Sequence, residues 1–347
     1  MAAAVSATDP TPEWRASSAD TVEDDLAAVW REPPQRGLSR ALMSNLVIAG
    51  GQVTSRHLSG MTEAIGGPLL AEVVERHPAR AILLDYAPDG ADADAADSVG
   101  VGVLGFGPPS ARYGVEAIAV RVVCAEQSIP SIVARLIRGG LPTTLWWTGD
   151  LSRGAPPAIL TALARQLLYD SASWRDVSGG LGAVAEVLGR SHAPEVADLN
   201  WRRLAPMRHA LVQAAAGAAP DADPRDLVPA AVRVKHRPGS AALAWLLAGW
   251  LGSRLGWRPS DGTPQIDEAS DGAVILAATI GNSGWRASAS MTRCGVAVKI
   301  GGSRAPLLIP VPAESEGAAA AAELLHLASD QHLKDAVLAL TAGRGPR

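Results

Sequence analysis

The stretch Ser128-Ile-Pro-Ser-Ile-Val-Ala-Arg-Leu-Ile-Arg-Gly-Gly-Leu-Pro-Thr-Thr-Leu-Trp-Trp-Thr148 decides the fold. Its first half places apolar residues at the i, i+3, i+4 spacing of an amphipathic helix, and Gly139-Gly140 ends that helix. Its second half, 143–148, is a short apolar run typical of a strand. Another apolar run, 116–124, precedes the helix. The order strand, helix, strand favours parallel strands joined by a crossover helix.

The same alternation extends outward from this unit. Apolar runs ending at Gly50 and covering 81–86 predict further buried strands, and the residues between 58 and 76 predict a helix. Downstream, helices are predicted over 156–168, over 181–188 and from Pro206 to about Ala216, and 87–112 is predicted to be a loop. We therefore expect an α/β domain over 36–216, with a mainly parallel sheet flanked by helices. Residues 1–35 are expected to be a mobile segment that contains a short acidic helix over 21–31.

The pattern changes after a stretch rich in Ala, Asp and Pro, 217–228, which we interpret as a linker. Residues 231–237 alternate between apolar and basic side chains, as in a strand with one exposed face. Four short strands are expected over 273–280, 285–291, 294–300 and 305–311, and one helix over 317–340. This half, 229–347, is expected to be a smaller α+β domain with an antiparallel sheet.

The composition is that of a globular protein. The chain has 347 residues, of which 48% are hydrophobic and 19% charged. Its net charge is −4, which argues against a protein that binds nucleic acid through its overall charge. The N-terminus lacks the features of a signal peptide, and the most apolar later segment is too short for a membrane span. Two cysteines, Cys124 and Cys294, give no disulfide framework. We expect a cytoplasmic protein.

No catalytic, cofactor or metal motif is predicted. Gly100-Val-Gly102-Val-Leu-Gly105 matches the dinucleotide fingerprint, but no helix follows it to receive a pyrophosphate. The phosphate-binding loop, zinc-protease and serine-nucleophile motifs do not occur, and the seven histidines are scattered.

Two sets of large side chains are candidates for recognition. The first is Trp146, Trp147 and Asp150 at the end of a strand, where α/β sheets place ligand crevices; one tryptophan should enter the core and the other face a crevice or a partner. The alternatives are that both tryptophans are buried as simple packing and that Asp150 caps the helix that follows it. The second set is typical of interface anchors, of phosphate-binding arginines, or of a solvated basic helix face. Its members are Asn200, Trp201, Arg202, Arg203 and Arg208.

An ordered set of motifs resembles the OpcA family, the glucose-6-phosphate dehydrogenase assembly proteins of cyanobacteria and actinobacteria. The matching residues are 43–47, 77–82, 146–150, Asp170-Ser171, 198–204 with Pro206 and Arg208, and 253–257. The family usually has Thr-Pro-Trp-Arg where this chain has Ala205-Pro-Met-Arg208.

This resemblance implies a non-catalytic protein without a cofactor. It would bind glucose-6-phosphate dehydrogenase, favour the enzyme's active oligomer as an allosteric activator, and so support NADPH supply in the oxidative pentose phosphate pathway. The residue-based alternative is a sugar-phosphate sensor or enzyme that uses an arginine-lined crevice at the strand ends.

Overall fold

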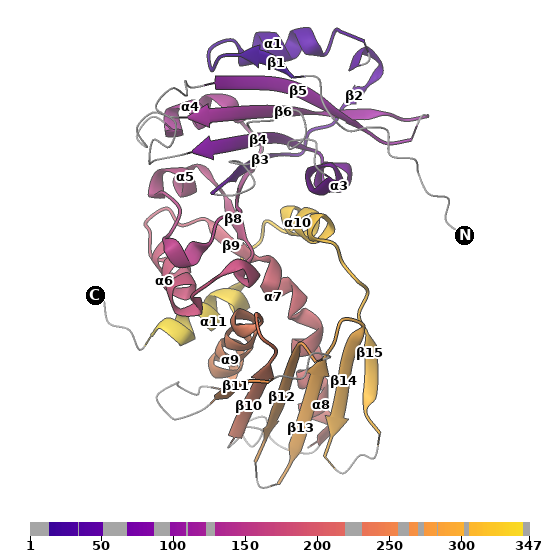
Figure 1. Cartoon of the computed structure of the whole chain (residues 1–347), viewed down its shortest axis with the longest axis vertical. Coiled ribbons are helices and arrows are strands. Elements are labelled where there is room, and N and C mark those ends of the chain that lie inside the picture. Colours follow the sequence, from indigo (N-terminus) through magenta and orange to yellow (C-terminus); the bar gives the residue numbers. More distant parts are fainter. Residues whose placement is uncertain are drawn as a thin grey trace.

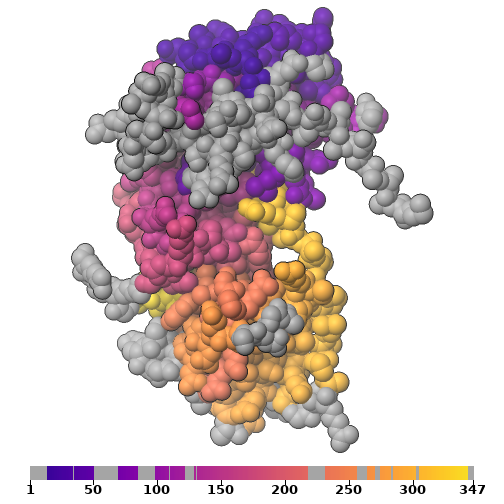
Figure 2. All heavy atoms as spheres, in the orientation of Figure 1, coloured from indigo at the N-terminus to yellow at the C-terminus, as the bar shows by residue number. Residues whose placement is uncertain are grey.

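The computed structural model contains two β-sheets, one above the other along the long axis of the molecule (Figure 1). The structure describes residues 14–33, 35–50, 68–86, 98–108, 110–122, 129–218, 231–255, 264–269, 274–282, 284–301 and 305–342. Figure 2 shows yellow residues close to the C-terminus on the right-hand side, where the upper and lower parts meet. In the described part of the chain, no helix combines the length and apolar character that crossing a bilayer requires.

The first sheet has nine strands and is mainly parallel, as predicted. Its order is β1 (Arg15–Ser17), β5 (Ser98–Phe106), β6 (Tyr113–Val122), β4 (Ala79–Tyr86), β3 (Ser44–Ala49), β7 (Thr143–Trp147), β8 (Gln166–Tyr169) and β9 (Glu195–Asp198), and β2 (Ser39–Arg40) pairs with β6. All neighbours from β6 to β9 are parallel, whereas β5 and β1 join antiparallel at one edge.

The order of the parallel strands reverses between β3 and β7. From β3 the chain builds β4 and β6 on one side, and then returns through α4 (Ile129–Leu136) to β7 on the other side. Ile48 lies opposite Trp146 and Ala49 opposite Trp147, so these two strands end together. A reversal of this kind leaves a crevice at the carboxyl ends of the two strands, where open α/β sheets place their ligands.

Helices cover both faces of the first sheet, which explains why its strands are continuous apolar runs. One hydrophobic cluster packs α1 (Val22–Val29), α4 and α6 (Val177–Leu188) against Val47, Leu84 and Leu145. The other packs α3 (Pro68–Arg76) against Leu46, Leu83 and Trp146. The remaining helices of this part are α5 (Ala158–Leu163), α7 (Leu199–Arg203) and α8 (Ala205–Ala218).

The described part of the N-terminal segment is packed, contrary to our expectation of a mobile stretch up to residue 35. β1 pairs with β5, and α1 buries Val22, Leu26 and Val29. The fully buried Arg80 fixes the helix further, because its guanidinium donates to Glu23 at 2.7 Å and lies 3.5 Å from the buried Glu116.

The second sheet has six strands and confirms the predicted α+β class. Its order is β11 (Gln265–Glu268), β10 (Ala231–His236), β12 (Leu276–Gly281), β13 (Arg286–Met291), β14 (Gly295–Ile300) and β15 (Leu307–Pro310). Only the β10–β11 pair is parallel among the pairings of these strands. α8 and α9 (Ala241–Leu255) pack on one face, and Figure 1 shows α8 behind the strands.

The last two helices return to the first sheet. α10 (Glu316–Leu325) packs against α3 and α7, whereas α11 (Gln331–Thr341) packs against α9, α6 and β9. The prediction of one helix over 317–340 was therefore wrong. The helix α10 is followed by its C-cap His326, and Asp330 is the N-cap that precedes α11. The Asp330 carboxylate accepts the Leu333 N–H at 3.0 Å.

Other parts of the sequence-based prediction were also wrong. The predicted helix over 156–168 ends at Leu163, and Gln166–Tyr169 forms the buried strand β8 instead. The predicted loop over 87–112 contains the strand β5, and strand β9 was not predicted. Cys294 is exposed and directly precedes β14 instead of lying within it. Cys124, most of the predicted 217–228 linker and the start of the predicted helix 58–76 lie outside the described residues.

Candidate functional site

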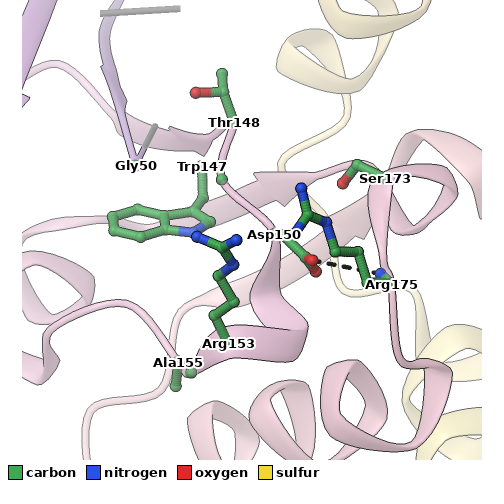
Figure 3. Close-up of a pocket in the computed structure, with 10 residues that line it drawn as sticks. Gly50, Trp147, Thr148, Asp150, Arg153, Ala155, Ser173 and Arg175 are labelled. Atoms are coloured by element: carbon green, nitrogen blue, oxygen red, sulfur yellow. Dashed lines mark hydrogen bonds between the residues drawn. The ribbon is translucent and has the colours of Figure 1, made fainter. Parts of the chain in front are cut away.

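A crevice with a volume of about 450 Å³ lies where β3 and β7 end (Figure 3). The indole of Trp147 forms one wall and covers Gly50, whose φ of 97° suits glycine. A Cβ atom on Gly50 would come within 2.4 Å of the Trp147 ring, so only glycine leaves room for the indole. Trp146 points to the opposite face and is buried in the core. The tryptophan pair therefore divides between core and crevice, as strand alternation predicts.

Asp150 has a structural role at the floor of the crevice. Its carboxylate accepts the N–H of Ser152 at 2.9 Å and the N–H of Arg175 at 3.3 Å, which caps the short turn after β7. Burial alone would raise the pKa of Asp150, but these hydrogen bonds and the nearby charge of Arg153 hold it below its usual value. The carboxylate is thus ionised and turned toward backbone donors. The predicted alternative, that Asp150 caps the segment after the strand, is confirmed.

Two arginines that the sequence analysis did not single out complete the crevice. Arg153 lies in the turn after β7 and Arg175 in the loop after β8, and Figure 3 shows both side chains reaching into the space beside Trp147. Both are exposed, and neither forms an ion pair with any described residue. Both arginines follow closely after neighbouring parallel strands, and this position in the sequence could have been used to predict them.

The Asn200–Arg208 segment lies elsewhere and faces the interior. Asn200 and Trp201 are buried, and the Asn200 amide donates to the Ser171 hydroxyl at 3.1 Å. The Trp201 indole N–H donates to Asp330 at 2.7 Å, and the Arg208 guanidinium lies 3.7 Å from the centre of the Trp201 ring. These contacts fix the start of α11 against α7 and α8.

The two remaining arginines of this segment bind acidic side chains of the same chain. Arg202 bridges α7 to Glu314 at 2.8 Å and to Glu323 of α10 at 3.1 Å, and the hydrogen bond to Glu314 contributes most to raising the pKa of Arg202. Arg203 pairs with Asp170 at 2.8 Å. The structure therefore brings Trp147 and Asp150 together in the crevice but places the arginine set at the contact with the C-terminal helices. A role of either set in partner binding stays a prediction.

A buried polar group lies beside this second set. Burial, and then the charge of Asp170, raise the pKa of Asp198 to about 7, although its carboxylate accepts the N–H groups of Ser171 and Asn200 at 3.0 and 2.9 Å. Burial also lowers the pKa of Arg208 to about 10. A cavity of about 550 Å³ adjoins both side chains, between β9, α7 and α11. No group of three or more His, Cys, Asp or Glu side chains that could hold a metal ion occurs among the described residues.

Two family models match adjacent parts of the chain. The model for the N-terminal domain of the glucose-6-phosphate dehydrogenase subunit matches residues 71–186, and the model for its C-terminal domain matches residues 194–337. Together they extend from α3 to α11, across both sheets.

Curated relatives agree with these models. A protein of Nostoc punctiforme that is named OpcA, for the OxPP cycle, is 29% identical over 219 residues, which cover 60% of this chain and 44% of the relative. A protein of Synechocystis sp. with the same name is 27% identical over 142 residues, or 39% of this chain and 28% of the relative. The chain thus matches less than half the length of either relative.

Similarity to solved structures is weaker. An oxidoreductase from Sinorhizobium meliloti is 10% identical, with a TM-score of 0.46 over 87% of this chain and 96% of that one. The aldose-aldose oxidoreductase of Caulobacter crescentus is 13% identical, with a TM-score of 0.39 over 87% and 98%. At this level neither structure carries an argument about activity. The two family models together with the curated relatives decide the assignment, and this chain belongs to the OpcA family of glucose-6-phosphate dehydrogenase assembly proteins.

Proposed function

We propose that this chain is a non-catalytic assembly partner of glucose-6-phosphate dehydrogenase that binds the enzyme's active oligomer in preference to its inactive form. A protein that binds one state better shifts the population toward that state, which would raise the enzyme's activity and the supply of NADPH. The family assignment supports the partnership. One structural observation supports the mode of action, namely the open face of the second sheet.

This open face lies opposite α8 and α9 and carries no helix among the described residues. Strand register aligns two rows of side chains across it. One row runs from Arg233 through Thr279 and Ser288 to Lys299. The other runs from Lys235 through Ala277, Ser290 and Ala297 to Leu308. Small side chains at the centre make the face flat, and basic side chains flank them.

The edge strand β15 adds exposed apolar side chains at the border of the open face. Leu308 is 67% exposed and lies on this face opposite Ala297, whereas Leu307 is 63% exposed and points to the other face; among the described strands β15 pairs only with β14. An exposed apolar edge strand is a template for association, so proteins normally cover or charge it. A flat basic face with an apolar edge fits a partner surface that is acidic and carries its own apolar patch. We assign this surface to the dehydrogenase.

The proposal is tested with the dehydrogenase of the same organism. Its rate at low glucose 6-phosphate is measured with and without this protein, and the mixture is run on a sizing column. We expect activation and co-elution, and we expect the double variant Arg233→Glu with Lys299→Glu to lose both while remaining folded. Arg36→Glu is the matched control, because Arg36 is exposed on the first domain and forms no ion pair with a described residue. If neither activation nor co-elution occurs with the unchanged protein, the partnership is wrong.

The residues predicted from sequence as partner contacts are a second set of candidates, at two separate places in the structure. Trp147 at the crevice and Arg203 on α7 are accessible, whereas the buried Trp201 would act by holding α11 in place. Full activation by a folded Trp147→Ala, Arg203→Ala double variant would remove these candidates and leave the open sheet face.

A further inference from the structure

We infer that the crevice at the ends of β3 and β7 binds a phosphorylated small molecule, with the phosphate between Arg153 and Arg175 and the remainder of the ligand against Trp147. This inference goes beyond the assembly role and does not depend on it, because the crevice lies on the first domain and the proposed docking face on the second.

The position of the crevice is the first support. It lies at the carboxyl ends of two adjacent parallel strands at the point where the strand order reverses. In open α/β sheets this is where ligands bind, because the loops that leave neighbouring strands diverge there and leave a concave space. The volume of about 450 Å³ falls in the usual range for small-molecule sites.

The charges around the crevice are the second support. Arg153 and Arg175 form no ion pair with a described residue, and they reach into one concave space from two separate segments (Figure 3). Guanidinium groups bind phosphate oxygens through paired N–H donors, which makes a phosphate dianion the natural ligand for two of them.

Asp150 offsets only one of these two positive charges. Its two carboxylate oxygens accept backbone N–H groups of Ser152 and Arg175, so the carboxylate is engaged by the chain on its own side of the crevice. Two guanidinium groups and one carboxylate leave a net positive charge. The Ser173 hydroxyl also lines the space; it donates to the Asp170 carbonyl oxygen at 2.7 Å and is left to accept a hydrogen bond from a ligand hydroxyl.

The walls of the crevice determine which kind of phosphate fits. Trp147 is partly buried and presents the side of its indole to the space, which offers a flat apolar surface to the carbon skeleton of a ligand. Gly154 lines the same space, and a Cβ atom there would have no neighbour within 4 Å, so a ligand can approach the backbone closely at this position. A phosphate monoester of a compact polar molecule, such as a sugar phosphate, suits this combination.

The experiment uses the isolated full chain and three probes. Glucose 6-phosphate represents the monoester, inorganic phosphate its charged group alone, and glucose the same skeleton without phosphate. A ligand that binds only the folded state raises the unfolding midpoint, so thermal shift is measured for each probe and the dissociation constants are measured by calorimetry. We expect glucose 6-phosphate and inorganic phosphate to raise the midpoint and glucose to leave it unchanged.

Variants then locate the binding. Arg153→Gln or Arg175→Gln alone should weaken binding of glucose 6-phosphate about tenfold or more, since each removes a charged hydrogen-bond donor. The double variant should abolish binding, and Arg293→Gln, in the exposed turn between β13 and β14, should change nothing. All three substituted side chains are exposed, and unfolding curves without ligand check that each variant folds.

A further variant tests the contact of the ligand with Trp147. Trp147→Ala should weaken binding of glucose 6-phosphate more than binding of inorganic phosphate. An equal loss for both probes would overturn the role of the indole. Absence of any midpoint shift or heat at 10 mM glucose 6-phosphate, or binding that persists in the Arg153→Gln, Arg175→Gln double variant, would overturn the site itself. Because the dehydrogenase is absent from these measurements, their failure would leave the assembly role untouched.

Discussion

Replacing Asp198 by asparagine is expected to stabilise the protein above pH 7 and to have little effect near pH 4. The Asp198 side chain is buried, and one of its oxygens accepts the N–H groups of Ser171 and Asn200. An asparagine carbonyl can accept the same two donors, so the substitution keeps the cap, while its N–H₂ takes the place of Oδ2, which has no hydrogen-bond partner, and adds a cost that does not change with pH. The pH-dependent part of the change therefore isolates the free energy of placing a negative charge at this position.

The magnitude follows from the pKa of Asp198, which burial raises from 3.8 to about 7 in the folded protein. Between these two values the unfolded chain has released the proton and the folded chain retains it, so the free energy of unfolding falls as the pH rises. The loss is complete above pH 7 and amounts to about 4 kcal/mol, since each pKa unit corresponds to about 1.4 kcal/mol. Between pH 5 and pH 8 the wild type should lose about 2–3 kcal/mol relative to Asp198→Asn.

The assay is urea denaturation of both proteins at pH 5, 6, 7 and 8, and the quantity of interest is the difference in free energy of unfolding at each pH. Other titrating groups are common to both proteins and cancel in that difference. Asp176→Asn is the matched control, because Asp176 also caps a helix, through Ser178 and Gly179, but its side chain is exposed. A difference between wild type and Asp198→Asn that stays constant from pH 5 to pH 8 would refute the reasoning.

Two further substitutions test contacts that fix the architecture. Trp201→Phe removes the hydrogen bond to the Asp330 carboxylate and should lower the free energy of unfolding, measured with denaturant, by about 1.5–3 kcal/mol. If that bond fixes the helix, amide exchange in α11 should become faster, and unchanged exchange in α11 would count against that role. Gly149→Ala would place a Cβ atom 1.7 Å from the carbonyl oxygen of Gly50, so the ends of β3 and β7 must separate, and the unfolding free energy should fall by about 1–3 kcal/mol. Gly182→Ala meets no atom within 4 Å and should instead stabilise helix α6 by about 0.5–1 kcal/mol, so equal effects of the two glycine changes would contradict the steric explanation.

The sequence predicted those parts of the fold in which the local pattern and the tertiary environment agree. Residues 129–136 have a helical apolar stripe and form α4, and residues 231–236 alternate and form a half-buried strand. Strand β8 was missed because its four residues are all buried, and a short run buried on both faces has no periodicity to distinguish it from a helix. The glycines of β5 likewise hid a strand inside an apparent loop.

The candidate site was only half predictable for a related reason. Strand alternation alone predicted that one tryptophan of the pair faces a crevice or a partner, but Arg153 and Arg175 belong to different segments, and their convergence depends on β7 and β8 being neighbours. Trp201 has the character of an interface anchor, and it does anchor an interface, although within one chain. Its partner Asp330 lies 129 residues away, and no local pattern reports such a contact.

The return of α10 to the first sheet constrains how the protein is made. Ala319, Ala320, Ala321 and Leu324 belong to the hydrophobic cluster that covers the α3 side of the nine-stranded sheet. A chain emerging from the ribosome has all described strands of that sheet long before these residues appear, so this apolar face is not fully covered while the second sheet is being synthesised. The packing of the first sheet is therefore completed only after the second sheet has been translated, and a chain that stalls within the second sheet exposes an apolar face to chaperones and proteases.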